Sequence, residues 1–340
     1  MIGNKMIKCR YLKLTYRLSC FIGDCKKCYW LTSIFLQGVL LGMTSSTKHK
    51  VLRKAIFPVA GLGSRFLPAT KASPKEMMAV VDKPLIQYAV EEAVSAGITE
   101  MIFVTGRAKR AIADHFDKAY ELEHQLEKSG KKELLKIARG VVPKGVSCTY
   151  IRQTEALGLG HAVLTAAHLI GEEPFAVLLA DDLIHGETPA LKQMVEQHNF
   201  YGSSVVAVQQ VSGAAISAYG VISGVQQGDH LYLLDGIVEK PRVEDAPTDM
   251  GVTGRYIFSP QIFDHLRALK PGAGGEYQLT DAIQMLLMQE QVLAYEFQGT
   301  RYDCGSKIGL LRANIELGLE HPEIGSKLRD FLKNELFQKL

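Results

Sequence analysis

Between residues 50 and 200, short apolar runs alternate with longer stretches of helical periodicity. The apolar runs predict strands at residues 54–60, 101–105, 148–153 and 175–179. The stretches between them predict helices at residues 84–96, about 120–129 and 160–169. Strands that alternate with helices in this way are typical of a mostly parallel, doubly wound sheet.

Beyond residue 203 the pattern changes to strands with little helix between them. Strands are predicted at residues 204–209, 219–225, 231–239 and 251–258, and helices return at residues 260–269, 280–289 and 307–319. We expect this half to be mixed or antiparallel and to build the acceptor side of a cleft. The sequence therefore predicts an α/β domain over residues 43–340, whose central mixed, mostly parallel sheet is flanked by helices.

The segment at residues 1–42 differs in composition from this body. It contains seven of the 39 basic residues and one of the 36 acidic residues, which leaves 32 basic and 35 acidic residues in the body. The body therefore lacks the basic surface expected of a nucleic-acid-binding protein.

No run reaches the roughly 18 apolar residues of a membrane-spanning helix. Only Cys148 and Cys304 lie in the body, which predicts no disulfide framework and a reducing cytoplasm.

Three interpretations of residues 1–42 remain open. Their basic start and the apolar run at residues 31–43 resemble a signal peptide, but without a clear cleavage site. Cys25 and Cys28 form a lone C-x-x-C, which is a weak signal for a metal or redox site. We favour a disordered or non-native extension, because Met43 is followed by a polar stretch and then by the first strand.

The first predicted strand leads into a glycine-rich loop, G-L-G-S-R-F-L-P at residues 61–68. Glycines after a strand allow backbone N–H groups to approach phosphate oxygens. A dinucleotide-binding fingerprint is the obvious alternative, but Phe66 replaces its third glycine, and Pro68 and Pro74 prevent the helix that should follow. A Walker-type loop fails as well, since no Gly-Lys-Ser/Thr closes the run.

The same loop carries cations. Arg65, Lys71 and Lys75 lie within eleven residues, and two prolines stiffen the path between them. Solvated surface charges are the ordinary alternative for such residues. A stiff loop that presents cations beside backbone donors favours a triphosphate ligand.

This loop and several later motifs closely resemble the bacterial UTP–glucose-1-phosphate uridylyltransferases. The likeness begins with G-L-G-S-R-F-L-P-A-T-K at residues 61–71 and P-K-E-M at residues 74–77. It continues in the family's order with V-D-K-P-L-I-Q-Y at 81–88, G-L-G-H-A at 158–162, V-E-K-P at 238–241, G-R-Y at 254–256, Q-L-T-D-A at 278–282 and D-C-G at 303–305. Several motifs in order are far more specific than any one of them, and they cover most of the body.

The resemblance implies a Rossmann-like nucleotidyltransferase fold and a defined reaction. The phosphate of glucose 1-phosphate would attack the α-phosphorus of UTP, giving UDP-glucose and pyrophosphate. Such chemistry needs in-line positioning and neutralisation of negative charge more than covalent participation of the protein. A nucleotide-binding half at about residues 51–200 would face a sugar-phosphate-binding and C-terminal half at about residues 201–340.

The resemblance also implies a nucleotide site. Arg65 and Lys75 would be catalytic residues that neutralise part of the charge of the triphosphate, and Asp181 would be the third catalytic residue. The nucleotide-binding set would be Ala60, Gly61, Gly63, Glu76, Gln153 and Gly158. In this set, the Gln153 amide would bond the uracil edge, since an amide both donates and accepts.

A metal is implied at the end of the fourth predicted strand. Asp181 follows that strand, where a carboxylate points into the crevice that binds ligands in open sheets. Its oxygens suit Mg²⁺, although the neighbouring Asp182 offers the same ligand type. The family's alignment favours Asp181 and adds Asp303 as a second metal ligand.

The sugar phosphate is implied to bind in the second half. Lys240 would bind its phosphate as a point charge. Glu239 would accept hydrogen bonds from the glucose hydroxyls, and Gly220 and Gly254 would bring the backbone close to the sugar. An exposed Glu-Lys-Pro turn is the ordinary alternative for residues 239–241.

Other functions remain as alternatives. A sister enzyme would use dTTP or another hexose 1-phosphate, although Ala60-Gly61 and Leu67-Pro68 favour the uridine type. A catalytically silent nucleotide-binding regulator would be expected to have lost Lys75, Asp181 or Lys240, and all three are present. A membrane-anchored protein would depend entirely on residues 1–42. We expect a cytoplasmic homo-oligomer with Mg²⁺ as cofactor and no nucleic-acid or membrane partner.

Overall fold

The computed structural model describes residues 50–339, and the predicted extension at residues 1–42 lies outside them. The described residues belong to a single unit of the chain, which begins at Lys50. No helix among them combines the length and the apolarity that crossing a membrane requires.

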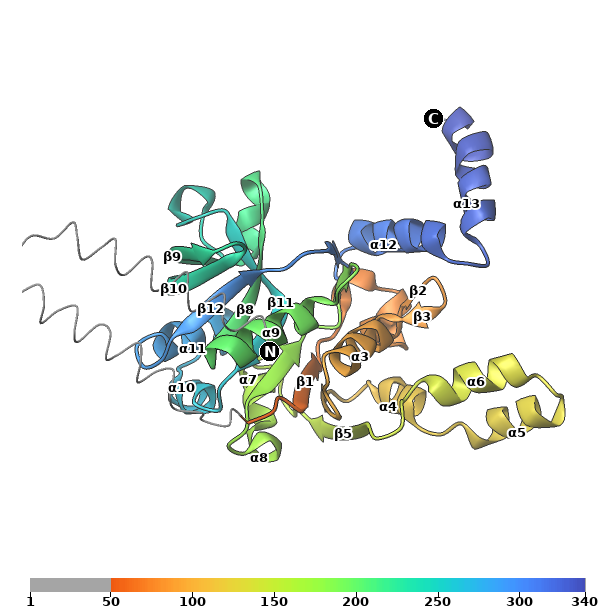
Figure 1. Ribbon diagram of the computed structural model, residues 1–340, viewed down its shortest axis with the longest axis horizontal. Coiled ribbons are helices and arrows are strands. Elements are labelled where there is room, and N and C mark those ends of the chain that lie inside the picture. The colour runs from red at the N-terminus through yellow and green to blue at the C-terminus, as the bar shows by residue number, and fades with distance from the viewer. Residues whose placement is uncertain (1–49, 340) are drawn as a thin grey trace, which may run out of the picture. The chain divides into compact units, whose positions relative to one another are not determined.

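A nine-stranded sheet forms the centre of this unit (Figure 1). Its strand order is β5-β4-β1-β6-β11-β8-β12-β10-β9. Along the chain the strands are β1 (Lys54–Val59), β4 (Glu100–Thr105), β5 (Ser147–Arg152), β6 (Phe175–Leu178), β8 (Ser204–Gln210), β9 (Gly220–Gly228), β10 (Leu231–Glu239), β11 (Met250–Phe258) and β12 (Val292–Glu296). All eight predicted strands are confirmed, and the ninth strand of this sheet, β12, was not predicted.

Strands β5, β4, β1 and β6 run parallel to one another. Parallel strands place their carboxyl ends at the same edge of a sheet. The segments that follow these strands therefore gather at this edge. They are the glycine-rich loop after β1, Gly106 after β4, Gln153 after β5 and Asp181 after β6.

The other half of the sheet is not parallel, so the prediction of a mostly parallel sheet is wrong. β11 runs antiparallel to β6 and β8, and β10 runs antiparallel to β12 and β9; only β12 and β8 are parallel. Residues 229–230 alone join β9 to β10, and so short a connection can join only antiparallel strands. A further pairing of Gly251 in β11 with Val221 in β9 curls this half of the sheet. The prediction of a mixed sheet is confirmed.

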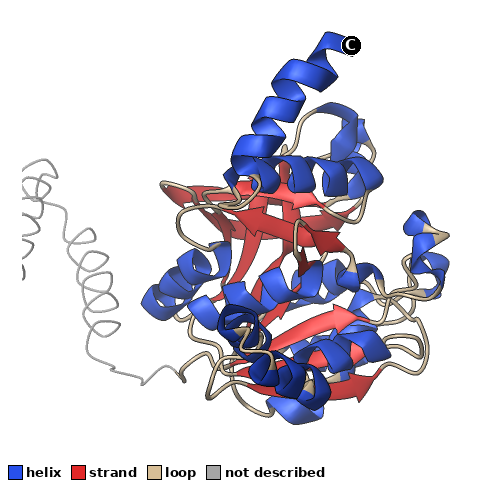
Figure 2. Ribbon diagram, turned by 90° about the vertical axis from the view of Figure 1, so that its right-hand side faces the viewer, coloured by secondary structure: helices blue, strands red, loops and turns tan. Residues whose placement is uncertain are grey.

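Helices cover both faces of the sheet (Figure 2). One face packs against α7 (Leu159–Thr165), α8 (Ala167–Ile170), α10 (Ile262–Ala268) and α11 (Leu279–Leu286). The other packs against α3 (Leu85–Ser95), α4 (Arg110–Phe116) and α9 (Ala190–Tyr201). Strand β1 shows why two cores form: Ile56 enters the first and its neighbours Ala55 and Phe57 enter the second, because side chains alternate along a strand.

One predicted helix is divided in two. The sequence predicted a single helix over residues 160–169, whereas α7 ends at Thr165 and α8 begins at Ala167. The Thr165 hydroxyl donates a 2.8 Å hydrogen bond to the His161 carbonyl, which competes with the helical backbone bonds.

Smaller elements surround the central layers. Helices α5 (Tyr120–Lys128) and α6 (Lys132–Gly140) form a hairpin, and α12 (Lys307–Glu320) and α13 (Gly325–Phe331) follow near the carboxyl end (Figure 1). Two short ribbons pair β2 (Ala79–Val80) with β3 (Lys83–Pro84) and β7 (Asp182–His185) with β13 (Thr300–Asp303). The second ribbon pairs Asp182 with Asp303, which brings two acidic segments distant in sequence to one place.

Candidate active site

Two adjoining cavities lie at the carboxyl edge of the parallel strands. The larger holds about 280 Å³ and is lined by residues of the β6–β7 turn, of β9 to β11 and of β13. The smaller holds about 210 Å³ and is lined mainly by residues 61–66 of the glycine-rich loop. Arg65 lines both cavities, and Lys75 and Gly305 complete the smaller one.

The glycine-rich loop is built from three separate 3₁₀ turns, at Ser64–Phe66, Ala69–Lys71 and Lys75–Met77. This confirms that the prolines prevent a regular helix. Gly63 has a left-handed φ of 69°, and a Cβ there would lie only 3.2 Å from the Cβ of Lys75. Glycine therefore allows the start of the loop to fold directly over Lys75.

Lys75 points at Asp181 across the boundary between the cavities. Its Nζ lies 2.6 Å from Asp181 Oδ2. Burial lowers the pKa of the Lys75 ammonium, but the Asp181 carboxylate outweighs burial, so the pKa lies above its usual 10.5. Burial likewise raises the pKa of Asp181, and Lys75 more than offsets this, so the pKa lies below 3.8. Both groups are therefore charged at neutral pH.

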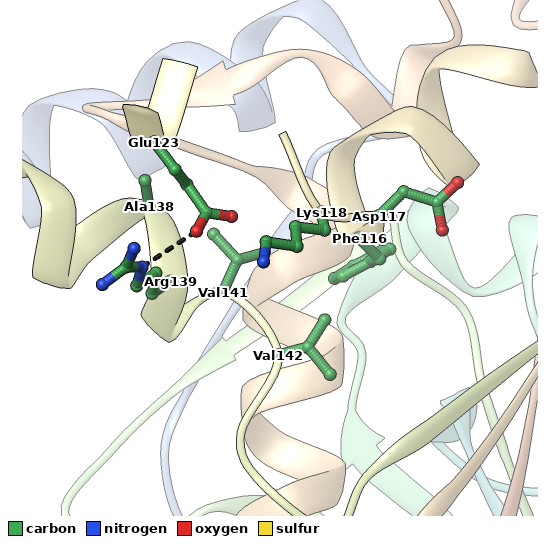
Figure 3. Close-up of a pocket in the computed structure, with 8 residues that line it drawn as sticks. All are labelled: Phe116, Asp117, Lys118, Glu123, Ala138, Arg139, Val141 and Val142. Atoms are coloured by element: carbon green, nitrogen blue, oxygen red, sulfur yellow. Dashed lines mark hydrogen bonds and ion pairs between the residues drawn. The ribbon is translucent and has the colours of Figure 1, made fainter. Parts of the chain in front are cut away.

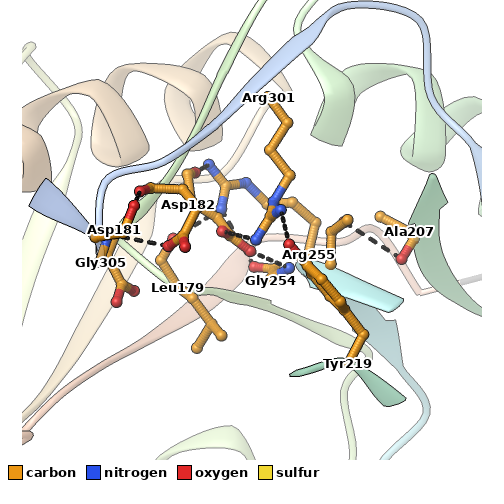
Figure 4. Close-up of polar contacts among 12 residues, drawn as sticks. Leu179, Asp181, Asp182, Ala207, Tyr219, Gly254, Arg255, Arg301 and Gly305 are labelled. Atoms are coloured by element: carbon orange, nitrogen blue, oxygen red, sulfur yellow. Dashed lines mark hydrogen bonds and ion pairs between the residues drawn. The ribbon is translucent and has the colours of Figure 1, made fainter. Parts of the chain in front are cut away.

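The two adjacent aspartates have different surroundings (Figure 4). Asp182 is buried, and its Oδ2 accepts a 2.6 Å hydrogen bond from the Gly254 N–H while its Oδ1 pairs with Arg301. Both of its oxygens are therefore engaged by the protein. Both aspartates line the larger cavity, but the Asp181 side chain is 26% exposed and the Asp182 side chain only 9%. Of the two, only Asp181 has a carboxylate that a ligand can reach.

Asp303 and Gly305 stand next to Asp181. A Cβ placed on Gly305 would lie 3.0 Å from Asp181 Oδ2, 3.0 Å from Asp303 Oδ1 and 3.4 Å from an Arg65 nitrogen. The Gly305 N–H donates to Asp303 Oδ1 at 3.1 Å, and the Cys304 N–H donates to the Asp181 carbonyl at 2.8 Å. Glycine thus leaves a space flanked by two carboxylate oxygens and a guanidinium.

On the far wall of the larger cavity lie Glu239 and Lys240, at the end of β10. Their side chains form a 3.1 Å ion pair, and Lys240 remains more than half exposed. The backbone of Lys240 has an unusual positive φ of 44° and is held by a 3.0 Å hydrogen bond from its N–H to the Tyr219 carbonyl. Glu239 Oε2 accepts a 3.0 Å bond from the Thr280 hydroxyl, and a Cβ on Gly220 would lie 2.8 Å from the Thr280 methyl.

This chain is similar to known proteins in its sequence and in its fold. The profile of the nucleotidyl transferase family matches residues 54–318. The chain belongs to the nucleotidyl transferase family. It is 49% identical over 286 residues to the UTP–glucose-1-phosphate uridylyltransferase YngB of Bacillus subtilis, a match that covers 84% of this chain and 96% of that protein.

Two solved structures are similar to most of this chain. A UTP-bound enzyme described as UGPase, from Acinetobacter baumannii, has a TM-score of 0.78 and 41% identity, covering 84% of this chain and all of that one. A UDP-glucose pyrophosphorylase complexed with UDP-glucose has a TM-score of 0.74 and 45% identity, covering 80% of this chain and all of that one. The resemblance drawn from the motifs is therefore confirmed.

The residues that the resemblance assigned to the base lie at the end of β5 in this nucleotidyl transferase. Gln153 is buried, and its amide nitrogen donates to the Gly158 carbonyl at 3.2 Å and lies 2.9 Å from His161 Nδ1. Its amide oxygen has no hydrogen bond within the described part of the chain. Gly158, with φ of 93°, faces the segment at Glu276 and Tyr277, where a Cβ would lie 2.9 Å from the nearest atom.

Glu76 has a different position from the other predicted nucleotide residues. It is almost fully buried and pairs with the equally buried Lys109 at 2.7 Å. Burial raises the pKa of Glu76, and Lys109 opposes this shift. The pair lies beneath the glycine-rich loop, next to Lys75, so Glu76 supports the loop from inside.

Several residues that line or shape the cavities were not predicted from the sequence motifs. Arg301 lines the larger cavity, pairs with Asp182 and donates a 2.9 Å bond to the Tyr219 hydroxyl. Gly106 follows β4, and a Cβ there would lie 3.0 Å from the Ala60 carbonyl oxygen. The only signal for Arg301 was its place two residues before Asp303. Lys71, one of the three predicted cations, is exposed and lines neither cavity.

A third cavity lies apart from these residues, beside the hairpin of α5 and α6 (Figure 3). It holds about 300 Å³, and its lining includes Phe116, Val141 and Val142 together with the Glu123–Arg139 ion pair at 2.8 Å. Its lining also includes Asp117 and Lys118, and none of its lining residues lines either of the two cavities at the carboxyl edge.

Cys304 has no chemical part in the site. Burial, together with Asp182 and the two other carboxylates nearby, raises the pKa of the Cys304 thiol to about 12. A thiol with this pKa remains protonated at neutral pH and is a poor nucleophile.

Proposed function

We propose that this chain transfers the uridylyl group of UTP to glucose 1-phosphate, giving UDP-glucose and pyrophosphate. A phosphate oxygen of glucose 1-phosphate forms a bond to the α-phosphorus of UTP, and the bond from that phosphorus to the oxygen bridging to the β-phosphate breaks. Pyrophosphate leaves with the bonding electrons. The observation that carries this proposal is the Lys75–Asp181 pair, which lies between a cation-bearing glycine loop and a cavity walled by Glu239 and Lys240.

Arg65 and Lys75 supply positive charge where the triphosphate would lie. Arg65 lines both cavities, so it can contact both the leaving phosphates and the reacting phosphate. Preorganised cations of this kind stabilise the charge that develops in phosphoryl transfer without any covalent step. The backbone of Ala60, Gly61 and Gly63 supplies N–H groups beside them.

Asp181 and Asp303 are the residues that would hold Mg²⁺. Their oxygens flank the space beside Gly305, and magnesium is typically bound through one or two carboxylates with waters and substrate phosphates completing its shell. Among the described residues, no group of three or more His, Cys, Asp or Glu side chains is arranged to hold a metal ion. When bound, the ion supplies charge neutralisation at the phosphates.

The base and the sugar are assigned to opposite sides of the reacting phosphates. The free amide oxygen of Gln153 is an acceptor suited to the N3–H of uracil. Gly158 turns the chain tightly at the same place. On the other side, Lys240 binds the sugar phosphate and Glu239 the sugar hydroxyls, while Gly220 and Gly254 keep side chains out of the cavity.

This division gives the two halves of the body separate tasks. Residues 51–200 form a Rossmann-like, parallel nucleotide-binding half, and residues 201–340 form the sugar-phosphate-binding half. A cytoplasmic location and a homo-oligomeric assembly remain predictions.

Pyrophosphate release is the direct test. We expect the purified chain to release pyrophosphate from UTP only when glucose 1-phosphate and Mg²⁺ are both present, and to use dTTP, CTP, ATP and GTP much more slowly. Asp181→Asn is the control for catalysis at this site. Equal rates with dTTP would assign the chain to the sister activity, and absence of release with any nucleotide would refute the proposal.

A further inference from the structure

Beneath the larger cavity lies a buried arginine whose donors are all engaged. Arg255 of β11 is only 1% exposed. Its Nη1 donates to the Leu179 carbonyl at 2.8 Å and to the Gly254 carbonyl at 3.2 Å, and its Nη2 donates to the Asp182 carbonyl at 2.7 Å (Figure 4). The remaining donors, on Nε and Nη2, bind Glu92 of α3 at 2.8–3.1 Å.

These contacts enclose one short turn. Leu179 and Asp182 are the first and last residues of the turn that carries Asp181, and Arg255 binds the carbonyls of both. The Leu179 N–H donates to the Gly254 carbonyl at 2.8 Å, and the Asp182 N–H donates to the Leu179 carbonyl at 3.2 Å. Together with the bond from Cys304 to the Asp181 carbonyl, these contacts fix the backbone on both sides of Asp181.

Glu92 fixes the arginine in turn. It is a buried carboxylate on α3, and its Oε1 also accepts a 2.9 Å hydrogen bond from the Leu191 N–H in α9. The pair therefore ties the turn to two helices on the same face of the sheet. An arginine fork can bind two carbonyls and a carboxylate at once, whereas a lysine ammonium has only three donors on a single nitrogen.

We propose that Arg255 and Glu92 are positioning residues that hold the Leu179–Asp182 turn so that the Asp181 carboxylate faces the reacting phosphates. Neither side chain touches a substrate, since both are buried beneath the turn. Isolated charges are costly to bury, and this buried pair lies directly at the turn that presents one carboxylate. The inference rests on the proposed function, because it takes Asp181 to be the residue that the turn presents.

The test uses Arg255→Lys and Glu92→Gln in the full-length chain. Glu290→Gln is the matched control, since Glu290 accepts hydrogen bonds from the Ser204 and Ser259 hydroxyls elsewhere in the sheet and does not touch the turn. Three quantities are measured for each variant: kcat for UDP-glucose formation, the Mg²⁺ concentration for half-maximal rate, and the affinity for Mn²⁺ in the presence of UTP by electron paramagnetic resonance. Thermal unfolding reports stability separately.

We expect the two test variants to lose roughly 10- to 100-fold in kcat and in metal affinity, as disruption of the shell around a metal ligand commonly does. The KM for UTP should change much less, and Glu290→Gln should keep wild-type metal dependence even if it is less stable. Should Arg255→Lys fail to fold, Glu92→Gln carries the test alone. Wild-type kcat and Mn²⁺ affinity in a folded Glu92→Gln variant would overturn the inference.

The same measurements separate this inference from the proposed function. Full activity in Asp181→Asn would show that Asp181 is not the residue presented to the phosphates, and would overturn both. Loss of activity in Asp181→Asn, with normal behaviour in the Glu92 and Arg255 variants, would overturn only the positioning roles.

Discussion

At the scale of single residues, neighbours in sequence have different surroundings here. Asp181 and Asp182 are chemically identical and both line the larger cavity, yet Arg301 and the Gly254 N–H occupy the oxygens of Asp182, whereas Asp181 keeps a partly exposed carboxylate. Glu239 and Lys240 likewise differ in burial, with Lys240 the more exposed. Which of two neighbouring side chains a ligand can reach is therefore decided by the partners that the fold supplies.

The first residue-scale prediction concerns Lys240. Lys240→Ala should raise the KM for glucose 1-phosphate and lower kcat/KM for it about 10- to 100-fold, the usual effect of losing a charge-assisted hydrogen bond. The KM for UTP should stay nearly constant. Arg242→Ala is the control, because Arg242 is an exposed cation two residues away that pairs with Glu244 and Asp245. Steady-state kinetics with each substrate varied in turn would measure both, and a larger effect on UTP would contradict the assignment.

The second residue-scale prediction concerns pH. The pKa of Asp181 is lowered, so its stabilising contribution is present above about pH 4 and is lost only as the pH falls through the lowered value. The pKa of Lys75 is raised, so its contribution is present below 10.5 and is lost only as the pH rises through the raised value.

We therefore expect Lys75→Met to reduce the free energy of unfolding by about 1 kcal/mol, with the same difference at every pH between about 5 and 9. Urea unfolding at several pH values would measure it. A difference that disappears between pH 6 and pH 8 would show that one member of the pair titrates near neutrality.

At the scale of elements, glycines determine how the loops of the site meet. The start of α7 packs on the segment before α11, where the Gly160 N–H donates a 2.9 Å bond to the Tyr277 carbonyl. A Cβ on Gly160 would lie 2.7 Å from that carbonyl oxygen and 3.0 Å from Leu266. The sequence motif thus marks a close approach of two backbones beside Gln153.

Gly160→Ala should destabilise the chain by about 1–3 kcal/mol, since a backbone oxygen must move to make room. Gly140→Ala is the control: Gly140 ends α6, is exposed and has nothing within 4 Å of its Cβ position. That change should be neutral or stabilise by up to about 1 kcal/mol. Thermal and urea unfolding would compare the two, and equal effects would contradict the packing argument.

At the scale of the whole molecule, the family match is confined to the body of the chain. The profile begins at residue 54, and the Bacillus subtilis relative is covered over 96% of its length by 84% of this chain. The described residues contain both cavities and every predicted site residue. We therefore expect the activity to be independent of residues 1–42.

A chain that begins at Met43 should consequently keep the kcat and the KM values of the full chain within about twofold, because the family match and both cavities lie in residues that this chain retains. Pyrophosphate release and thermal unfolding of the two forms would be compared side by side. A large loss of activity in the shorter form, with unchanged unfolding, would show that the segment at residues 1–42 acts in catalysis.

The sequence located many elements of the fold, although β12 and α9 were not predicted. Apolar runs located the eight predicted strands, because a strand that is buried on both faces, such as β6, is a nearly continuous run of apolar residues. The curled, half-antiparallel end of the sheet was not predictable in the same way. Its strand order depends on pairings such as Gly251 with Val221, which no local pattern records.

The sequence by itself determined which residue types are available to the site: a stiff cationic glycine loop, acidic residues after strands and a Glu-Lys-Pro turn. Only the tertiary structure decided how they are used. It paired β7 with β13 and so brought Asp303 to Asp181, it buried Asp182 against Arg301, and it placed Arg255 under the turn. The physical reason is that a side chain's reach, charge and partners depend on residues far away along the chain, and these become neighbours only when the sheet forms.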